Sequence, residues 1–312
     1  MFDRRRVLQT LAGLFLALAG TGAYAAAWEP GRQILTRYRL RPRGWPEGRR
    51  LRLAVISDLH IGSLHVPLSR VTEIVDATNA LKPDLTLLLG DFVASRRRAA
   101  SDPPMRDWAA ELARLQARDG VFAVLGNHDW WHDPQVQAAR AGPTQVGEAL
   151  QGAGIPVLEN RALRLDTADG PLWLAGLGDQ IAFLPRRRGG WMEGIDDLAG
   201  TMAQIADDNA PVIMMAHEPD VFARMPDRVS LTLSGHTHGG QVRLFGWAPI
   251  VPSRYGNRYA YGHVREQGRD LVVSAGIGTS QLPIRFGIPP EIVLIELGEA
   301  GEVSSPDLIR SR

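Results

Sequence analysis

The feature that most limits the fold of this 312-residue chain is a series of short apolar runs that end in polar residues. Three of them in the first half are "LRLAVIS", "DLTLLLGDFV" and "GVFAVLGNHD". A run that is apolar along its whole length is typical of a strand buried on both faces. The segments between them, residues 67–81 and 105–118, have helical spacing, so β-α-β-α-β with short connections predicts an open α/β sheet.

The second half of the chain is richer in strands. "IPVLENRALRLD" and "PLWLAGLGD" are separated by "TADG", which predicts a hairpin. Four further strand-like runs follow, and residues 196–209 are expected to be helical. The predicted fold class is therefore α/β, with two β-sheets packed face to face as a sandwich and helices flanking them.

The first 27 residues predict a targeting segment. A basic head precedes an apolar stretch, Leu11–Ala19, and small residues follow at Ala23–Ala25, which is the order of a secretory signal peptide. "DRRRVLQ" resembles the twin-arginine export motif, with Arg4 and Arg5 as the pair. An uncleaved signal anchor is the alternative. Both interpretations use the twin-arginine or Sec export machinery and place the rest of the chain on the periplasmic side of the inner membrane, exported or anchored.

The remaining chain divides by composition. Residues 28–50, rich in Arg, Pro and Gly, are expected to form a stalk with one short strand at 33–40; residues 51–298 form the domain and 299–312 a C-terminal tail. The formal net charge of +1 gives no reason to expect nucleic-acid binding. The absence of cysteine excludes disulfides and thiolate metal sites. The oligomeric state is not fixed by the sequence.

Chemically active residues gather where the predicted strands end. Five separate strands deliver them, and five of the eight histidines are among them. The set is Asp58, His60, Asp91, Asn127, His128, Asp129, His217, His236 and His238. Each alone could cap a helix or form a turn, but the carboxyl ends of strands in an open sheet meet at one place. We therefore expect one site.

The residue types in this set point to metal ions. Carboxylate, amide and imidazole ligands without thiolate suit Mn²⁺, Fe²⁺ or Zn²⁺. Two neighbouring divalent ions need a shared ligand, and a carboxylate offsets their repulsion. Gly235, Gly239 and Gly240 allow a sharp turn around "HTH". Two divalent metal ions, with Mn²⁺ as the first choice, are the predicted cofactors.

The motifs D-x-H, G-D, G-N-H-D, a lone H and G-H-T-H, in this order across residues 51–297, resemble the calcineurin-like metallophosphoesterase superfamily. The resemblance implies a helix-flanked β-sandwich that hydrolyses phosphoesters with a water activated by two metals. It also implies roles. The first metal would be held by Asp58, His60 and His238, with Asp91 bridging, and the second by Asn127, His217 and His236. His128 would contact the phosphate and act as general acid or charge stabiliser, oriented by Asp129.

Departures from the family patterns indicate which branch of the superfamily the chain resembles. "GDFVASR" and "GNHD" lack the protein serine/threonine phosphatase signature, whereas residues 255–297 look like the bacterial exported or membrane-associated phosphodiesterases. That branch includes UDP-2,3-diacylglucosamine hydrolases and twin-arginine-exported phosphoesterases. Arg285 is a candidate phosphate contact, with a surface arginine as the alternative. Trp130 and Trp131 are candidate substrate-stacking residues, with core packing as the alternative.

The leading hypothesis is a dinuclear-metal phosphodiesterase acting on an envelope or lipid-linked phosphodiester or pyrophosphate, in contact with the membrane through its N-terminus. One alternative is the UDP-2,3-diacylglucosamine pyrophosphatase of lipid A synthesis, although that substrate belongs to the cytoplasmic face. Another is a non-catalytic, metal-containing envelope-binding protein, which would not require His128. A nucleotide phosphatase or cyclic-nucleotide phosphodiesterase would need a base-binding pocket. The arginine runs 96–98 and 186–188 are interpreted as solvated charges, the latter alternatively as an anion-binding flap.

Overall fold

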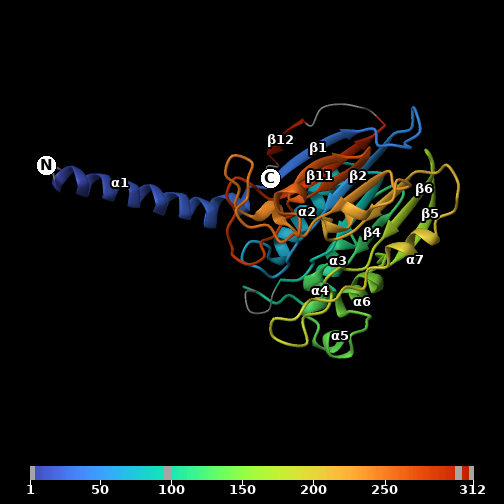
Figure 1. The fold of residues 1–312 in the computed structure, drawn as a ribbon, viewed down its shortest axis with the longest axis horizontal. Helices are drawn as coiled ribbons and strands as arrows, with labels where there is room; N and C mark the ends of the chain where they lie inside the picture. Colours follow the sequence, from blue (N-terminus) through green and yellow to red (C-terminus); the bar gives the residue numbers. More distant parts are fainter. Residues whose placement is uncertain (1–3, 95–99, 299–303, 309–312) are drawn as a thin grey trace.

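Two six-stranded sheets form the centre of the molecule in a computed structural model, which describes residues 4–94, 100–298 and 304–308 (Figure 1). The first sheet, in the order β12-β1-β11-β2-β3-β4, comprises β1 (Ile34–Leu40), β2 (Leu51–Ile56), β3 (Leu85–Leu89), β4 (Val121–Val124), β11 (Glu291–Leu297) and β12 (Ser304–Leu308). The second, in the order β5-β6-β7-β8-β10-β9, comprises β5 (Arg161–Thr167), β6 (Gly170–Gly176), β7 (Val212–Met215), β8 (Leu231–Ser234), β9 (Gly262–Glu266) and β10 (Arg269–Val273).

Alternation along the strands builds the core between the sheets. Leu53 and Val55 of β2 belong to the apolar cluster that joins the two sheets, whereas Ile56 belongs to the cluster under the helices. The same alternation separates Leu87 from Leu88 in β3. Because successive strand side chains point to opposite faces, a strand that is apolar throughout can serve both layers at once. The uninterrupted apolar runs of the sequence are explained in this way.

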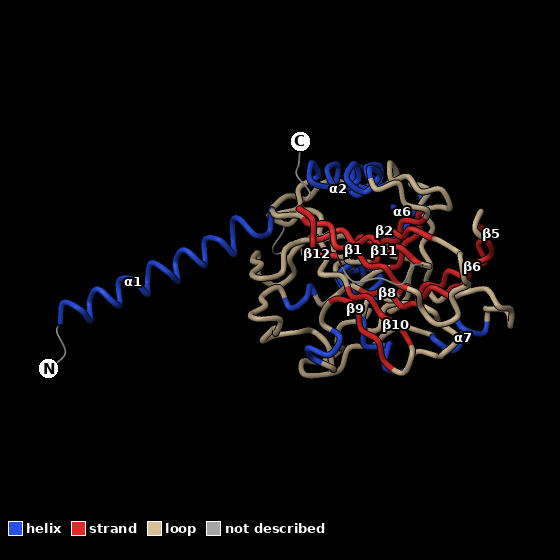
Figure 2. Tube along the Cα trace, turned by 90° about the horizontal axis from the view of Figure 1, so that it is seen from above, coloured by secondary structure: helices blue, strands red, loops and turns tan. Residues whose placement is uncertain are grey.

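Helices cover the outer faces of the sandwich, as Figure 2 shows. The helices against the first sheet are α2 (Leu68–Ala80), α3 (Met105–Leu112) and α6 (Gln145–Gly152). The second sheet is covered by α7 (Leu198–Ala203) and the 3₁₀ turn η3 (Pro219–Arg224). The short helices α4 (Asn127–Trp131) and α5 (Pro134–Ala139) follow β4. The predicted α/β class, a two-sheet sandwich flanked by helices, is confirmed.

The N-terminal segment is a helix that projects from this body. Helix α1 (Arg4–Ala23) has no buried residue, and a short neck of π- and 3₁₀-helical turns, η1 (Tyr24–Trp28) and η2 (Glu29–Gly31), joins it to β1 (Figure 1). The helix is long and apolar enough to cross a bilayer, a property that signal sequences share.

The expected stalk is part of the fold. Strand β1 pairs in parallel with β11 and antiparallel with β12, so residues 28–50 cannot be separated from the domain. The expected C-terminal tail likewise contributes β12 to the sheet. The predicted boundaries at 51 and 298 are therefore wrong. The partner of β1 lies more than 250 residues away in the chain, and a local pattern carries no sign of such a pairing.

This correction has a measurable consequence in β1. Tyr38 is 3% exposed within the core between the sheets, whereas the side chain of its neighbour Arg39 is 55% exposed. We predict that Tyr38→Ala lowers the free energy of unfolding by about 3 kcal/mol or more, because it leaves a cavity in the sandwich. Arg39→Ala, the matched control, removes only an exposed ion pair with Glu296 and costs less than about 1 kcal/mol. Denaturant unfolding would measure both free energies. Equal, small effects would contradict the assignment of β1 to the core and support the interpretation of residues 28–50 as a stalk.

Candidate metal centre

The carboxyl ends of five strands bring the predicted ligands to one edge of the sandwich. Strands β2, β3 and β4 are mutually parallel, as are β7 and β8. The parallel strands of each sheet therefore release their ends on the same side. Of the seven predicted ligands, all but His236 are buried, with 2% or less of their surface exposed. The sequence-predicted metal ligands are thus brought together.

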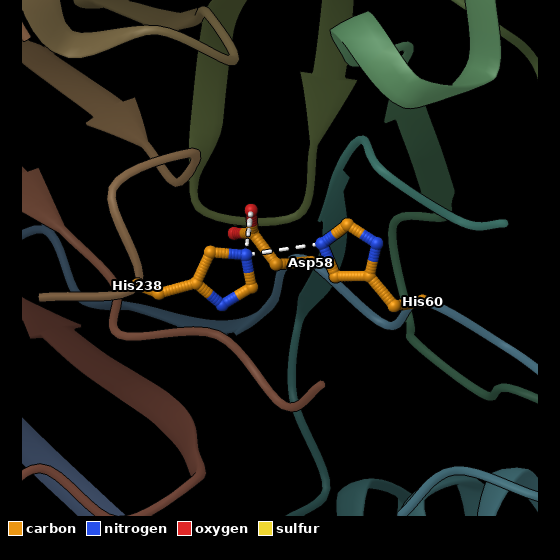
Figure 3. A group of neighbouring side chains, drawn as sticks. All are labelled: Asp58, His60 and His238. Carbon is orange, nitrogen blue, oxygen red and sulfur yellow. Dashed lines mark hydrogen bonds and ion pairs between the residues drawn. The ribbon is translucent and has the colours of Figure 1, made fainter. Parts of the chain in front are cut away.

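The first group contains Asp58, His60 and His238 (Figure 3). The Nδ1–H of His60 donates to the carbonyl of Val93 at 3.3 Å, which leaves its Nε2 unprotonated and facing inward. That Nε2 lies 3.0 Å from Nε2 of His238, and the latter lies 3.4 Å from Oδ1 of Asp58. Two imidazole nitrogens and a carboxylate oxygen therefore converge on one point.

The second group contains Asp91, Asn127, His217 and His236. His217 donates from Nδ1 to the carbonyl of Leu89 at 2.6 Å and directs Nε2 toward Oδ2 of Asp91, 3.3 Å away. Nδ1 of His236 lies 2.8 Å from Oδ1 of Asn127. The same oxygen, Oδ2 of Asp91, lies 3.6 Å from Nε2 of His60 in the first group. Asp91 therefore lies between the two groups, where a bridging ligand is required.

The donor atoms in both groups fit divalent cations. Nε2 of His236 faces the carbonyl of Pro252 at 3.0 Å, so its ring proton is used there and Nδ1 offers Asn127 a lone pair. Two acceptors at hydrogen-bond distance repel unless a cation lies between them. Among the described residues, the buried Nε2 of His217 has no well-aligned hydrogen-bond partner. All donors are nitrogen or oxygen, the set that Mn²⁺, Fe²⁺ and Zn²⁺ accept.

The protonation states of these side chains also favour binding of divalent cations. Burial lowers the pKa of His60 to about 4 and that of His238 well below its usual value, so both rings stay neutral and able to bind a metal. Burial would raise the pKa of Asp91, but the facing histidines, His217 first, hold it well below its usual range. Asp91 in turn raises the pKa of His217 against the effect of burial. A metal ion therefore competes with a proton at His217.

The ligands are held in an uncommon backbone conformation. Asp58, His60, Asp91, His236 and His238 have φ angles of +52°, +46°, +54°, +66° and +50°. Such left-handed conformations cost about 1–3 kcal/mol for a non-glycine residue and persist where the surroundings enforce them. A Cβ atom on Gly235 would collide with Ser57 and Asp58. The glycines around "HTH" thus leave room for the carboxylate as well as for a turn.

His128 stands beside the ligands, but its expected partner is wrong. Asp129 accepts hydrogen bonds from the backbone N–H groups of Gly126, Asp91 and Phe92 and so ties the ends of β3 and β4 together. Nδ1 of the His128 ring instead lies 3.0 Å from Nε2 of His132, and its Nε2 lies 3.4 Å from Ser280 Oγ. The missed residue is four positions after His128 on a helical turn, a spacing that places both on one face.

Two of the three expected substrate contacts are also wrong. Arg285 is fully buried: its guanidinium donates to the carbonyls of Gly278 and Ala275, and Nη2 lies 3.3 Å from Nδ1 of His238. It therefore supports a ligand and cannot reach substrate. Trp130 is 2% exposed and packs edge-on against Phe183 in the core. Trp131 does line the site, with its ring centroid 5.4 Å from that of His128.

Of the two arginine runs, one lies in the described part of the chain. Residues 186–188 are exposed on the loop between β6 and α7, and the loop is closed by a backbone bridge between Phe183 and Glu193. Residues 96–98 lie outside the described part of the chain.

Two hollows meet at the ligands. One, of about 320 Å³, is lined by His128, Asn127 and His238 on one side and by apolar residues of the loops 242–252 and 280–284 on the other. The second, of about 840 Å³, has more polar and charged residues in its lining than the first, among them Asp196, Asp220 and Arg254. Trp131, His236 and Pro252 border both. The site is therefore open in two directions.

Comparisons of the sequence with known proteins identify the family of the chain. The family model for calcineurin-like phosphoesterases matches residues 51–240. The phosphodiesterase YaeI of Escherichia coli is 32% identical over 95% of this chain and all of its own length, and the uncharacterised metallophosphoesterase YkuE of Bacillus subtilis is 29% identical over 93% and 96%. A solved dimetal phosphatase from Danio rerio aligns with a TM-score of 0.41 and 13% identity, covering 76% of this chain and 93% of that one. The chain belongs to the calcineurin-like phosphoesterase family and is a metal-dependent phosphoester hydrolase.

Proposed function

We propose that the chain is a two-metal phosphodiesterase that remains anchored in the inner membrane and cleaves a phosphodiester or pyrophosphate of an envelope or lipid-linked molecule on the periplasmic side. The observation that carries the two-metal assignment is Asp91, whose carboxylate faces both histidine groups at 3.6 and 3.3 Å. The preference for diesters is supported by the two hollows, because a diester phosphorus carries two substituents. The E. coli relative is itself named a phosphodiesterase.

The side chains of the site divide the work of hydrolysis. When bound, two divalent ions supply Lewis-acid stabilisation and an activated water, and Mn²⁺ is our first choice. With His132 Nε2–H donating to Nδ1 of His128, the His128 ring carries its proton on Nε2, which faces the substrate hollow. That N–H can donate to a phosphoryl oxygen or to the leaving oxygen. Burial lowers the pKa of His128 to about 4, and an adjacent phosphate anion would raise it.

The neck after α1 supports a retained anchor. Ala25 is 7% exposed and accepts a hydrogen bond from the backbone of Arg285 at 2.9 Å. The ring of Tyr24 packs edge-on against Phe286, with centroids 6.1 Å apart. Cleavage after Ala25, Ala26 or Ala27 would remove these contacts. The basic residues Arg4, Arg5 and Arg6 favour a cytoplasmic start of the helix and hence a periplasmic site. That side argues against UDP-2,3-diacylglucosamine as substrate.

Activity on model esters tests the reaction class. We predict that the full chain hydrolyses bis-p-nitrophenyl phosphate faster than p-nitrophenyl phosphate with Mn²⁺, and that a chelator abolishes both activities. His128→Ala should lower kcat by about 10²–10⁴-fold, the range for loss of a general acid, while the metal content stays near that of the parent. Metal analysis and initial rates measure these quantities. A chain that binds two ions yet turns over no diester would contradict the proposal and favour the envelope-binding alternative.

His132 provides a separate prediction. We expect His132→Ala to lower kcat by about tenfold with little change in KM or metal content, because the His128 ring loses the partner that fixes its proton on Nε2. His132→Gln, which keeps a side-chain N–H donor, should recover part of the loss. The control is His263→Ala, since His263 pairs with Asp270 on β10. Equal rates for His132→Ala and the parent would remove His132 from the mechanism.

The fate of the leader is measurable directly. Mass spectrometry of the chain isolated from the membrane fraction should find residues 4–27 present, because the neck is built into the body. A soluble periplasmic form that begins after residue 23 would contradict the proposal of a retained anchor and support the interpretation of the leader as a cleaved signal peptide.

A further inference from the structure

Exposed large apolar side chains are concentrated at one end of the body. An apolar rim is defined here as Leu64, Leu244, Phe245, Trp247, Ile250 and Leu282, with exposed fractions from 48% to 108%, and two of its members, Ile250 and Leu282, also line the smaller hollow. Every other exposed large apolar residue of the described body lies on the neck or on loops at this same edge. The described loops at the opposite edge, such as 41–50, contribute none. This asymmetry is typical of an interaction surface.

The rim is joined to the base of α1. Gln241 donates from Nε2 to the carbonyls of Leu282 and Ile284, at 2.8 and 2.9 Å, and so links the two rim loops. The backbone of Arg243 donates to Phe286, whose ring packs against Tyr24 of the neck. In both views the loops of this edge lie on the side from which α1 leaves (Figures 1 and 2). A bilayer that contains α1 would therefore lie next to the rim.

The rim leads into the site. Ile250 and Leu282, 78% and 55% exposed, belong both to the rim and to the wall of the 320 Å³ hollow, which ends at His128. The 840 Å³ hollow on the other side of His236 is the more polar of the two: Asp220 accepts hydrogen bonds from Ser253 Oγ and Arg254 N, and Arg224 pairs with Asp196. A phosphorus atom at the ligands thus has an apolar direction toward the rim and a polar direction away from it.

We propose that the apolar rim rests in the surface of the lipid bilayer and that the substrate is an amphiphilic phosphodiester drawn from it. Its acyl or prenyl chain occupies the smaller hollow and its hydroxyl-bearing head group the larger one. This inference rests on the proposed phosphodiesterase function. It adds the source of the substrate and the orientation in which it binds. Aromatic residues such as Phe245 and Trp247 are suited to the membrane interface.

The contact with lipid can be measured because the chain has no cysteine. A single cysteine at Phe245→Cys, carrying an environment-sensitive fluorophore, would be placed in the full chain reconstituted into vesicles of phosphatidylethanolamine and phosphatidylglycerol. Glu47→Cys is the matched control, because Glu47 is 88% exposed in the loop joining β1 to β2 at the opposite edge. We expect doxyl-labelled lipids to quench the first label and not the second. Equal quenching at both positions, or none at position 245, would overturn the proposal.

Activity separates this proposal from the one beneath it. The double substitution Phe245→Ser with Trp247→Ser removes two rim residues that do not line the hollow. We expect it to lower hydrolysis of p-nitrophenyl hexadecyl phosphate in the same vesicles by about tenfold or more, with hydrolysis of water-soluble p-nitrophenyl methyl phosphate within about twofold of the parent. Unchanged hydrolysis of the vesicle substrate would overturn the membrane contact alone. Failure of the parent on the soluble diester would instead overturn the phosphodiesterase assignment.

Discussion

The structure depends on a cluster of buried nitrogen and oxygen atoms at the ends of the strands, some of which face one another as hydrogen-bond acceptors. Nδ1 of His236 lies 2.8 Å from Oδ1 of Asn127, and among the described residues the buried Nε2 of His217 has no well-aligned hydrogen-bond partner. Because the other ring nitrogen of His236 donates its proton to the carbonyl of Pro252, the His236–Asn127 pair cannot be relieved by moving a proton between its two atoms. In a low-dielectric interior the repulsion is strong. Divalent cations convert it into attraction, so the buried cluster is stable as a metal centre and costly as anything else.

The rest of the site acts to hold this arrangement. The carboxylate of Asp129 accepts hydrogen bonds from backbone N–H groups after β3 and β4, and these bonds fix the loops that carry Asp91 and Asn127. Arg285 fixes the loop after β10 by donating to its carbonyls, and its charge further lowers the pKa of His238. Neither residue needs to touch substrate. Residues that look catalytic in the sequence can therefore be the ones that fix the strained ligand loops in place.

The sequence was sufficient to predict those features of the fold and the site that depend on local pattern and strand direction. Buried strands are visible as apolar runs, and parallel strands bring their ends together, so the convergence of Asp58, Asp91 and His217 could be predicted without coordinates. The partner of β1 could not, because strand pairing across more than 250 residues leaves no local signal. The burial of Trp130 and the orientation of Asp129 depend on which face of a five-residue helix meets the core. His132 was within reach through its spacing from His128.

Topology also explains why the N-terminal helix and the site share an edge. Strand β1 begins directly after the neck and runs away from it, and the loop 41–50 turns the chain back into β2, which is antiparallel to β11 and therefore to β1. The carboxyl end of β2, with Asp58 and His60, must return to the side of α1. Every strand parallel to β2 in its sheet adds its ligand there. A chain of this connectivity that keeps its N-terminal helix in a membrane has its metal ligands at the end of the body that faces the membrane.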